Sequence, residues 1–328
     1  MTSGKSENAI VLNMITLCAG LALQAPAHAA GSPDDSVASD GTLVPQSSVA
    51  ASVGKTGAQS PSFAGLADIT PADLYREGAV DVGKTLSPDE VRARAALPEG
   101  GAGALEGSPS EVIIGVDRRE QVYTTNFPTR ARVLITFGAS RCSGTLIDAD
   151  TVITAGHCVH SGGSNGSWYP VGSYEIIPGA DGESEPYGSC GATGLYSVTG
   201  WTSNAKEDYD YGAIKLDCTI GNTVGWYGYT SSVAQNDPAI IGGYPGDKPL
   251  THWLSADKVR AMTTRQIFYS ADTAGGNSGS AVWWDNNGAV MIGVHAYGTH
   301  GSGNHAKYNH GTRITSSVKS NFDYWKGL

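Results

Sequence analysis

The first third of this 328-residue chain lacks the residues that build a hydrophobic core. Residues 1–111 contain no tryptophan, and Phe63 and Tyr75 are their only aromatic residues, whereas all seven tryptophans lie beyond Val112. A segment that buries little apolar surface cannot offset the entropy cost of folding. The composition therefore predicts a folded domain from about Val112 onward, preceded by a largely flexible pro-segment over residues 31–111.

Basic residues are also scarce. Residues 1–111 carry 6 Lys and Arg against 13 Asp and Glu, a net charge of −7. Residues 112–328 carry 15 against 18, a net charge of −3. A nucleic-acid-binding protein typically has an excess of basic over acidic residues. Neither part does, so we expect no nucleic-acid partner.

Long hydrophobic runs are absent after the first thirty residues. Lys5 precedes the apolar stretch 9–23, and Ala27-His28-Ala29 fits a small-residue cleavage site, a pattern typical of a secretory signal. The apolar stretch is too short to predict a membrane span. We therefore expect residues 1–30 to be a signal peptide and the protein to be secreted, with no membrane partner.

Few cysteines are present, and four remain once Cys18 leaves with the signal peptide. An even number in a secreted chain predicts disulfides, and four cysteines allow three pairings. Cys142 and Cys158 bracket a predicted pair of strands beside His157, so we pair them. Cys190 then pairs with Cys218.

Short strands between turns make up the predicted domain, as expected for an antiparallel barrel or sandwich. They cover Ala131–Phe137, Ser143–Ile147, Val152–Ala155, Ser173–Ile177, Ala213–Leu216, Ala239–Tyr244, Ile267–Ser270, Ala281–Trp284 and Ala289–His295. One helix is predicted at the C-terminus, Thr315–Lys326, with Val318, Phe322 and Trp325 on one face. Another is predicted in the pro-segment near residues 87–97.

A serine stands between glycines in Gly-Gly-Asn-Ser-Gly-Ser, residues 275–280. Glycine permits the backbone angles of a tight turn, and a serine nucleophile needs a base and an orienting acid. His157, at the end of a predicted strand, is the candidate base for Ser278. Asp210 is the candidate acid. It is preferred to Asp208 because it directly abuts an apolar strand.

The order His157, Asp210, Ser278 is that of the chymotrypsin type of serine protease. The α/β-hydrolase type has another order and a Gly-x-Ser-x-Gly motif. Residue 280 is serine where that motif has its second glycine. The sequence therefore excludes the α/β-hydrolase arrangement.

Three stretches together resemble the chymotrypsin-fold serine proteases. They are SGTLIDADTVITAGHC (143–158), DYDYGAIKL (208–216) and GGNSGSAVW (275–283). Further stretches resemble the bacterial glutamyl endopeptidases: EPYGS (185–189), IGNTVGWYGY (220–229), GYPGDK (243–248), DTAGGNSGS (272–280), GVH (293–295) and GTRIT (311–315).

The resemblance runs from about Val112 to Lys326. It implies an all-β fold of two antiparallel six-stranded β-barrels with the active site between them. The N-terminal barrel would span residues 112–225, and residues 226–328 would form the C-terminal barrel and the terminal helix. We expect a monomer that hydrolyses polypeptides and requires no cofactor; a structural calcium ion is compatible with this expectation.

The same resemblance assigns further roles. The backbone N–H groups of Gly276 and Ser278 would form the oxyanion hole. His295 and Thr273 would donate hydrogen bonds to the carboxylate of a substrate glutamate. The amine of Val112, freed by cleavage after Glu111, would lie near this pocket and add a positive charge.

Asp272 supports a competing prediction. It precedes the nucleophile by six positions, the offset of the acid that selects Lys and Arg in trypsin. The chain would then be a trypsin-like protease of basic specificity, whereas in glutamyl endopeptidases an acid at this position is often turned away. Asn277 stands where trypsin has an aspartate that pairs with its new N-terminus, so activation should differ from that of trypsin.

The alternative classes of function are a non-catalytic binding module and a metalloenzyme. A secreted, non-catalytic binding module of the same fold would be expected if the catalytic residues were incomplete, and His157, Asp210 and Ser278 are all present. His300, His305 and His310 have no carboxylate nearby in the sequence, and their spacing suits no helical ligand pair. We therefore predict a loop surface there and no metal site.

Overall fold

The computed structural model describes Met1 and residues 31–53, 59–66, 84–85, 89, 94, 111–286 and 288–328. The predicted signal peptide, except Met1, lies outside the described residues, as does the predicted helix near residues 87–97, except Asp89 and Arg94. Residues 1–30 and 31–328 form separate units, and the description below concerns the second. No helix among the described residues is long and apolar enough to cross a membrane.

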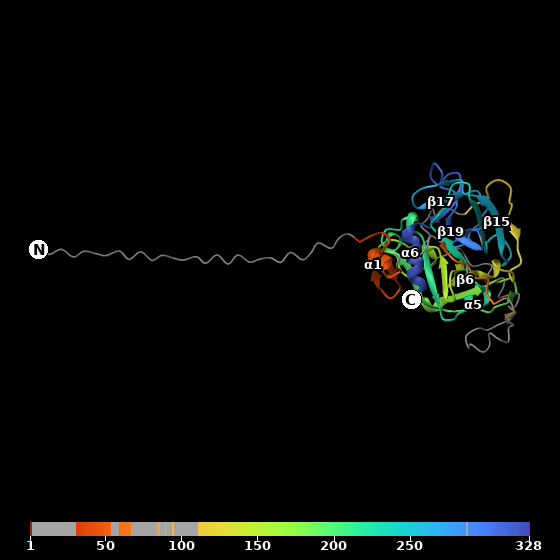
Figure 1. Cartoon of the computed structure of the whole chain (residues 1–328), viewed down its shortest axis with the longest axis horizontal. Helices are drawn as coiled ribbons and strands as arrows, with labels where there is room; N and C mark the ends of the chain where they lie inside the picture. The colour runs from red at the N-terminus through yellow and green to blue at the C-terminus, as the bar shows by residue number, and fades with distance from the viewer. Residues whose placement is uncertain are drawn as a thin grey trace. The chain divides into compact units, whose positions relative to one another are not determined.

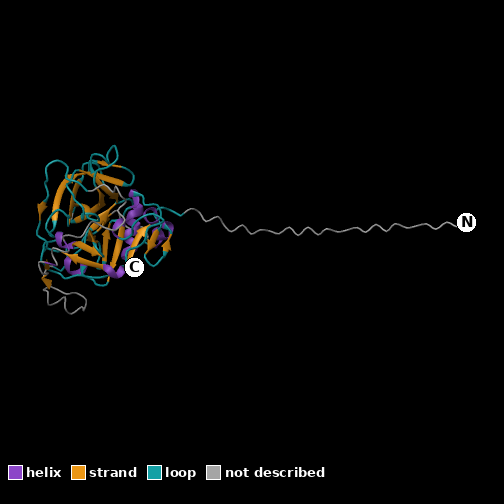
Figure 2. Ribbon diagram, turned by 180° about the vertical axis from the view of Figure 1, so that it is seen from behind, coloured by secondary structure: helices purple, strands orange, loops and turns teal. Residues whose placement is uncertain are grey.

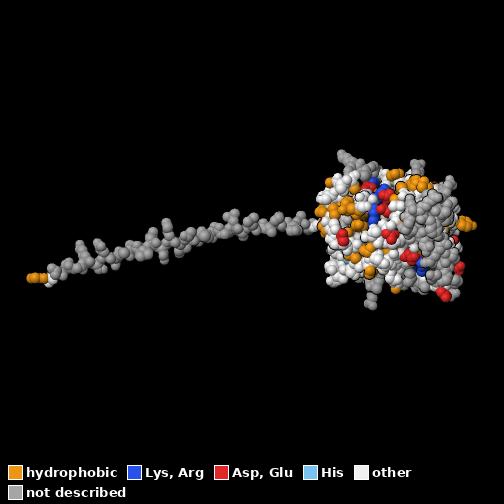
Figure 3. All heavy atoms as spheres, turned by 90° about the horizontal axis from the view of Figure 1, so that it is seen from below, with side chains coloured by type: hydrophobic (Ala, Val, Ile, Leu, Met, Phe, Trp, Pro, Cys, Tyr) orange, Lys and Arg blue, Asp and Glu red, His pale blue; other side chains and the backbone are white. Residues whose placement is uncertain are grey.

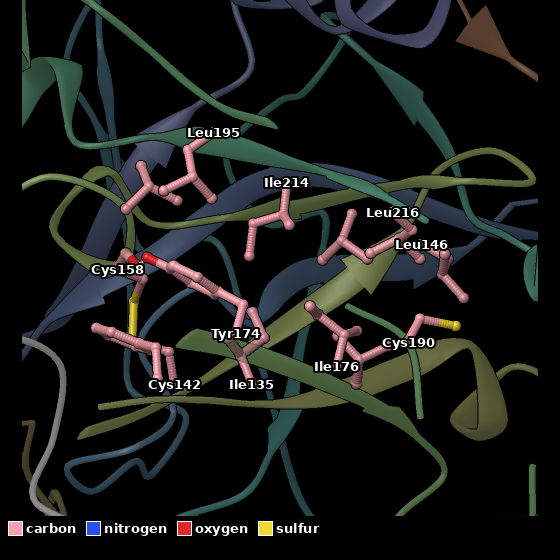
Figure 4. Close-up of a cluster of buried hydrophobic side chains, with 14 of the residues drawn as sticks. Ile135, Cys142, Leu146, Cys158, Tyr174, Ile176, Cys190, Leu195, Ile214 and Leu216 are labelled. Carbon is pink, nitrogen blue, oxygen red and sulfur yellow. Dashed lines mark hydrogen bonds between the residues drawn. A yellow bond between two sulfur atoms is a disulfide. The ribbon is translucent and has the colours of Figure 1, made fainter. Parts of the chain in front are cut away.

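Six main strands build the N-terminal sheet. They are β6 (Arg132–Phe137), β7 (Ser140–Leu146), β8 (Thr151–Thr154), β9 (Tyr174–Pro178), β11 (Ala192–Val198) and β12 (Gly212–Leu216). They pair antiparallel in the order β11-β12-β8-β7-β6-β9. A bridge between Ile176 and Cys190 joins the two ends, so the sheet closes on itself. Ile135, Leu195 and Ile214 are among the side chains that fill its interior (Figure 4).

Six further strands build the C-terminal sheet. They are β14 (Pro238–Gly243), β15 (Trp253–Lys258), β17 (Gln266–Tyr269), β18 (Ala281–Asp285), β19 (Ala289–Tyr297) and β20 (Asn309–Arg313). Their order is β17-β20-β19-β18-β14-β15, again antiparallel. Figure 2 shows the two sets of strands and the few short helices around them. The predicted all-β fold is confirmed.

Short elements complete the described part of the chain. The strands are β4 (Lys84–Thr85), β5 (Glu120–Gln121), β10 (Ser184–Glu185), β13 (Gly228–Thr230) and β16 (Ala261–Met262). The helical turns are η2 (Thr129–Ala131), η3 (Gly156–Cys158), η4 (Val171–Ser173), α4 (Thr199–Thr202), η5 (Glu207–Tyr209) and α5 (Gly221–Val224). β5 pairs with β15, so the segment predicted to open the N-terminal barrel is attached to the C-terminal sheet.

The C-terminal helix α6 (Ser316–Lys326) begins where the sequence predicts. Thr315 caps it, because its hydroxyl accepts a hydrogen bond from the N–H of Val318. Val318, Phe322 and Trp325 are completely buried. The predicted apolar face is therefore the face that packs on the protein.

The pro-segment departs from the prediction of a largely flexible chain. β1 (Ser36–Ala38) pairs with β11 and with β2 (Leu43–Val44), and β3 (Gln59–Ser60) pairs with β13. Helix α1 (Gln46–Ser52) packs beside α6 (Figure 1). The prediction is wrong for residues 31–53 and 59–66, because edge strands and polar contacts hold a segment that is too poor in apolar residues to fold alone.

Polar contacts account for much of this attachment. Asp34 is buried and accepts a hydrogen bond of 2.7 Å from Arg265. Asn321 donates to the backbone oxygen of Asp34, and the Trp325 indole donates to Ser36 at 2.8 Å. On the face shown in Figure 3, acidic and basic side chains of the described residues lie close together. This mixture of charges agrees with the sequence, in which basic residues do not outnumber acidic ones.

Candidate active site

The antiparallel pairing of β8 with β12 brings His157 and Asp210 together. His157 lies in η3, directly after β8, and Asp210 lies between η5 and β12. Nδ1 of His157 is 2.8 Å from Oδ2 of Asp210, and the His157 backbone N–H donates to Oδ1, also at 2.8 Å. Asp210 is completely buried, whereas Asp208 is exposed. A carboxylate placed in this way fixes the orientation of the imidazole.

Two residues that the sequence analysis missed also hold Asp210. The hydroxyl of Tyr297 donates to Oδ2, and the hydroxyl of Thr312 donates to the backbone oxygen at 3.1 Å. Both come from the strands β19 and β20. No local sequence signal marks them, because only the fold brings the C-terminal sheet to this carboxylate.

The loop with Ser278 is locked against the N-terminal barrel. Ser143 of β7 donates its hydroxyl to the oxygen of Gly276 at 2.7 Å and its N–H to the oxygen of Ser278 at 2.8 Å. Gly276 and Gly279 have φ values of 100° and 86°, where a side chain would be strained. A Cβ on Gly279 would also lie 2.1 Å from the hydroxyl of Thr154. The loop therefore needs glycine on both sides of the buried Ser278.

The carboxylate of Glu111 lies at this serine. The Ser278 hydroxyl donates to Oε1 of Glu111 at 2.8 Å, and Nε2 of His295 is 3.2 Å from the same oxygen. Glu111 and His295 are both buried. The side chain of Glu111, the residue that precedes the predicted cleavage point, therefore lies against His295. His295 is a residue expected to recognise glutamate.

Tyr269 orients His295, and the sequence analysis missed it. Its hydroxyl lies 2.6 Å from Nδ1 of His295. Burial, and then the charge of Glu111, raise the pKa of Tyr269 well above its usual value, so the phenol keeps its proton and donates it to Nδ1. The other ring nitrogen, Nε2, then carries the hydrogen that faces the carboxylate.

Thr273 and Asn309 surround Val112. The Thr273 N–H donates to the oxygen of Val112 at 3.3 Å, and the Asn309 amide donates to the same oxygen at 2.8 Å. The Val112 N–H is 3.3 Å from Oδ1 of Asn309. The hydroxyl of Thr273 is buried and has no hydrogen-bond partner among the described residues. This buried hydroxyl is therefore a polar group beside the backbone of Val112 that has room for a further hydrogen bond.

Asp272 is directed toward the segment that follows Val112. It accepts hydrogen bonds from the N–H groups of Ile114 at 2.8 Å and Arg118 at 3.0 Å, and its side chain is 3.4 Å from Nε of Arg118. Asp272 is 1% exposed. Nearby, Arg119 donates to Asp247 of the GYPGDK stretch at 2.7 Å. These contacts fix residues 114–119 on the C-terminal sheet.

The remaining predicted residues are also placed. Both predicted disulfides, Cys142–Cys158 and Cys190–Cys218, are present. The first lies next to His157. The prediction of no carboxylate near the three C-terminal histidines is wrong in space, because Oε1 of Glu207 lies 3.0 Å from Nε2 of His300.

The chain is similar in sequence to known proteins. The trypsin family model matches residues 116–320. A protein of Bacillus licheniformis named glutamyl endopeptidase is 34% identical over 98% of this chain and 98% of its own length. A protein of Bacillus subtilis named extracellular metalloprotease is 38% identical, covering 65% of this chain and 69% of its own length.

A solved structure gives the same result. The structure of a Glu endopeptidase in complex with MPD is 33% identical, with a TM-score of 0.59, over 66% of this chain and 100% of that chain. The protease Anisep from Arthrobacter nicotinovorans, 20% identical with a TM-score of 0.54 over 64% of this chain and 100% of its own, shares the fold.

Proposed function

Because the chain belongs to the trypsin family of serine proteases and is similar to glutamyl endopeptidases, we propose that it is a secreted endopeptidase. It cleaves polypeptides after glutamate, and less well after aspartate. It is made with a signal peptide of residues 1–30 and a pro-segment of residues 31–111. The mature enzyme comprises the two barrels, residues 112–225 and 226–328, works as a monomer and requires no cofactor for the reaction.

Ser278, His157 and Asp210 carry the proposed chemistry. Oγ of Ser278 attacks the carbonyl carbon of the scissile bond while Nε2 of His157 takes the hydroxyl proton. The same proton then passes to the leaving amine as the C–N bond breaks, which leaves an acyl-enzyme that water hydrolyses in the same two steps. Asp210 holds Nδ1 of His157 at 2.8 Å and stabilises the imidazolium.

The backbone N–H groups of Gly276 and Ser278 are proposed to bind the developing oxyanion. The positive φ of Gly276, 100°, supports this role because it allows the N–H to turn toward the substrate. Each donor of this kind contributes about 3 kcal/mol of transition-state stabilisation.

One observation carries the specificity for glutamate: the chain's own Glu111 lies against His295 and Ser278. His295 is set by Tyr269 to donate from Nε2, and the Thr273 hydroxyl is a second donor nearby. The competing trypsin-like function would need Asp272 in the pocket. The hydrogen bonds of Asp272 to Ile114 and Arg118 favour a role in holding the N-terminal segment instead.

The same contact supports a precursor that blocks itself. In the intact chain the Ser278 hydroxyl donates to the Glu111 carboxylate, so Glu111 itself occupies the proposed glutamate-binding position. Cleavage between Glu111 and Val112 would let Glu111 leave. The new amine of Val112 would stay close to the pocket, because Asn309 and Thr273 hold this residue, and would attract the carboxylate of the next substrate.

Two measurements test the proposal. Labelling with a serine-directed phosphonate should modify Ser278, and chromogenic peptides ending in Glu, Asp, Arg and Phe should be cleaved in the order Glu, Asp, then the others. Faster cleavage after Arg would favour the trypsin-like function. An unlabelled protein that cleaves none of the peptides would favour a non-catalytic binding module.

A further inference from the structure

Three histidines and a glutamate form a cluster outside the proposed catalytic site. His300 and His305 lie in the loop between β19 and β20, His310 lies in β20, and Glu207 lies in η5. The ring centroids of the three histidines are 4.7 to 5.2 Å apart. Nε2 of His300 is 3.0 Å from Oε1 of Glu207. Donor atoms of Glu207, His305 and His310 all lie within 4.8 Å of one another.

His310 gives a second, independent indication of a ligand. Its side chain is completely buried, yet neither ring nitrogen makes a hydrogen bond of normal length and angle among the described residues. Nε2 is 3.7 Å from Oε2 of Glu207, which is too far for a hydrogen bond. Buried polar groups without partners are rare in folded proteins and call for an explanation. A bound ion between His310 and Glu207 supplies one.

We propose that Glu207, His300, His305 and His310 bind one divalent transition metal ion of the zinc type. Three imidazoles and one carboxylate are donors that suit zinc and related metals, whereas calcium and magnesium prefer sites made of oxygen. Four ligands at about 2.0–2.2 Å in a tetrahedron lie roughly 3.4 Å apart. Donor atoms of Glu207, His305 and His310 already lie within 4.8 Å of one another, and Nε2 of His300 is 3.0 Å from the Glu207 carboxylate.

The surroundings fit such a site. Oε1 of Gln266 lies 2.6 Å from Nε2 of His305 and orients the ring, as outer partners of metal-binding histidines commonly do. His300 and His305 are partly exposed, so an ion can enter from solvent. His310 is completely buried and Glu207 is partly exposed, and the two hold the ion from separate elements.

The cluster lies next to the groups that position Asp210. The ring of Tyr297 stacks on His310 with centroids 5.4 Å apart, and its hydroxyl donates to Asp210. Glu207 precedes Asp210 in the same turn. An ion held by Glu207 and His310 therefore braces the carboxylate that orients His157, and it acts through position, not through contact with the substrate.

Binding is tested on the full chain carrying Ser278→Ala, which removes self-cleavage. After treatment with a chelator and dialysis, the protein is titrated with ZnCl₂ by calorimetry and with CoCl₂ by visible absorbance. We expect one ion per chain, a cobalt spectrum typical of four ligands, and a higher unfolding temperature in zinc. Calcium chloride should give no such binding. A protein that binds neither zinc nor cobalt, or that binds calcium alone, would overturn the proposal.

Matched variants locate the ion. Glu207→Gln and His305→Ala should each weaken zinc binding at least tenfold. Asp208→Asn and Lys307→Ala change exposed neighbours on the same two segments and should bind zinc as the parent does. Equal affinity in all four variants would place the ion elsewhere and refute the site. In the active enzyme, zinc removal should lower kcat with little change in KM. A kcat independent of zinc would overturn the link to Asp210.

Discussion

Asp272 decides between the two specificities, and Asp272→Asn is the sharpest test of its role. In the structure its carboxylate accepts two backbone hydrogen bonds, from Ile114 and Arg118, and lies 3.4 Å from the Arg118 guanidinium. A hydrogen bond to a charged group contributes about 1.5–3 kcal/mol, against about 0.5–1.5 kcal/mol for a neutral one. The substitution therefore removes about 1 kcal/mol per contact.

The amide adds a second cost. Asparagine has one oxygen, so its NH₂ group must face one of the two backbone N–H donors, and that buried donor loses its partner at a cost of about 1–3 kcal/mol. Over the two backbone contacts, the loss in the docking of residues 112–118 is together about 3–5 kcal/mol. Each 1.4 kcal/mol is a factor of ten in an equilibrium constant. We expect kcat/KM for a glutamyl peptide to fall by at least about tenfold, since Val112 no longer stays at the pocket.

The assay compares kcat/KM for peptides ending in Glu and Arg in the mature wild type and the variant. Asp257→Asn is the control, because Asp257 is a largely buried carboxylate of the same sheet that binds Arg260 and Ser270 instead of the N-terminal segment. It should lose stability and keep its specificity. If Asp272→Asn abolished cleavage after Arg and left cleavage after Glu unchanged, Asp272 would be the pocket residue and our argument would fail.

Three further predictions follow from the site and its surroundings. Purified Ser278→Ala precursor should keep its pro-segment, and added active enzyme should cut it after Glu111; N-terminal sequencing that finds unaided cleavage there would contradict self-processing. Tyr297→Phe removes a hydrogen bond to the Asp210 carboxylate and should lower kcat about tenfold with KM little changed; unaltered kcat would show that the hydroxyl is dispensable. Burial, followed by the charge of Arg132, holds the pKa of His252 well below its usual value, so below about pH 6.5 the unfolded chain binds a proton that the folded protein does not. The contribution of His252 to the free energy of unfolding is complete above about pH 6.5 and falls by about 1.4 kcal/mol per pH unit below it. Urea unfolding of His252→Gln at pH 7, 6 and 5 should lack that slope. A slope equal to that of the wild type would contradict the assignment.

The apolar strands were predictable from sequence, and the polar ones were not. Every predicted strand overlaps an observed one, from β6 to β19, and their ends agree within three residues. β11, β15 and β20 were missed because they contain few β-branched apolar residues. β20 reads Asn-His-Gly-Thr-Arg, and its buried Asn309 and Thr312 are satisfied by contacts with Val112 and Asp210. Such a strand is stabilised by partners that only the fold supplies.

The residues of the candidate site likewise divide into those that could be predicted from sequence and those that could not. The motifs around His157, Asp210 and Ser278 mark short stretches in which glycine and strand ends constrain the backbone locally, so the residues could be proposed from sequence. Tyr269, Tyr297 and Glu207 act on residues that lie 26 to more than 80 positions away. No local spacing pattern in the sequence relates residues that lie so far apart. The pro-segment was misjudged for a related reason: its composition cannot stabilise a separate fold, but it can add strands to an existing one.

The pairing of β1 with β11 gives the proposed maturation a consequence beyond the broken peptide bond. Ser36–Ala38 pairs with Tyr196–Val198, far in sequence from the proposed cut after Glu111. Cleavage alone would therefore leave a nicked, two-chain complex, and the pro-segment would leave only at the rate at which this complex dissociates. Its departure would uncover the backbone of β11 at these residues, and exposed strand edges invite pairing with other chains. The proposed mature form would thus have an edge open to pairing that its precursor keeps covered.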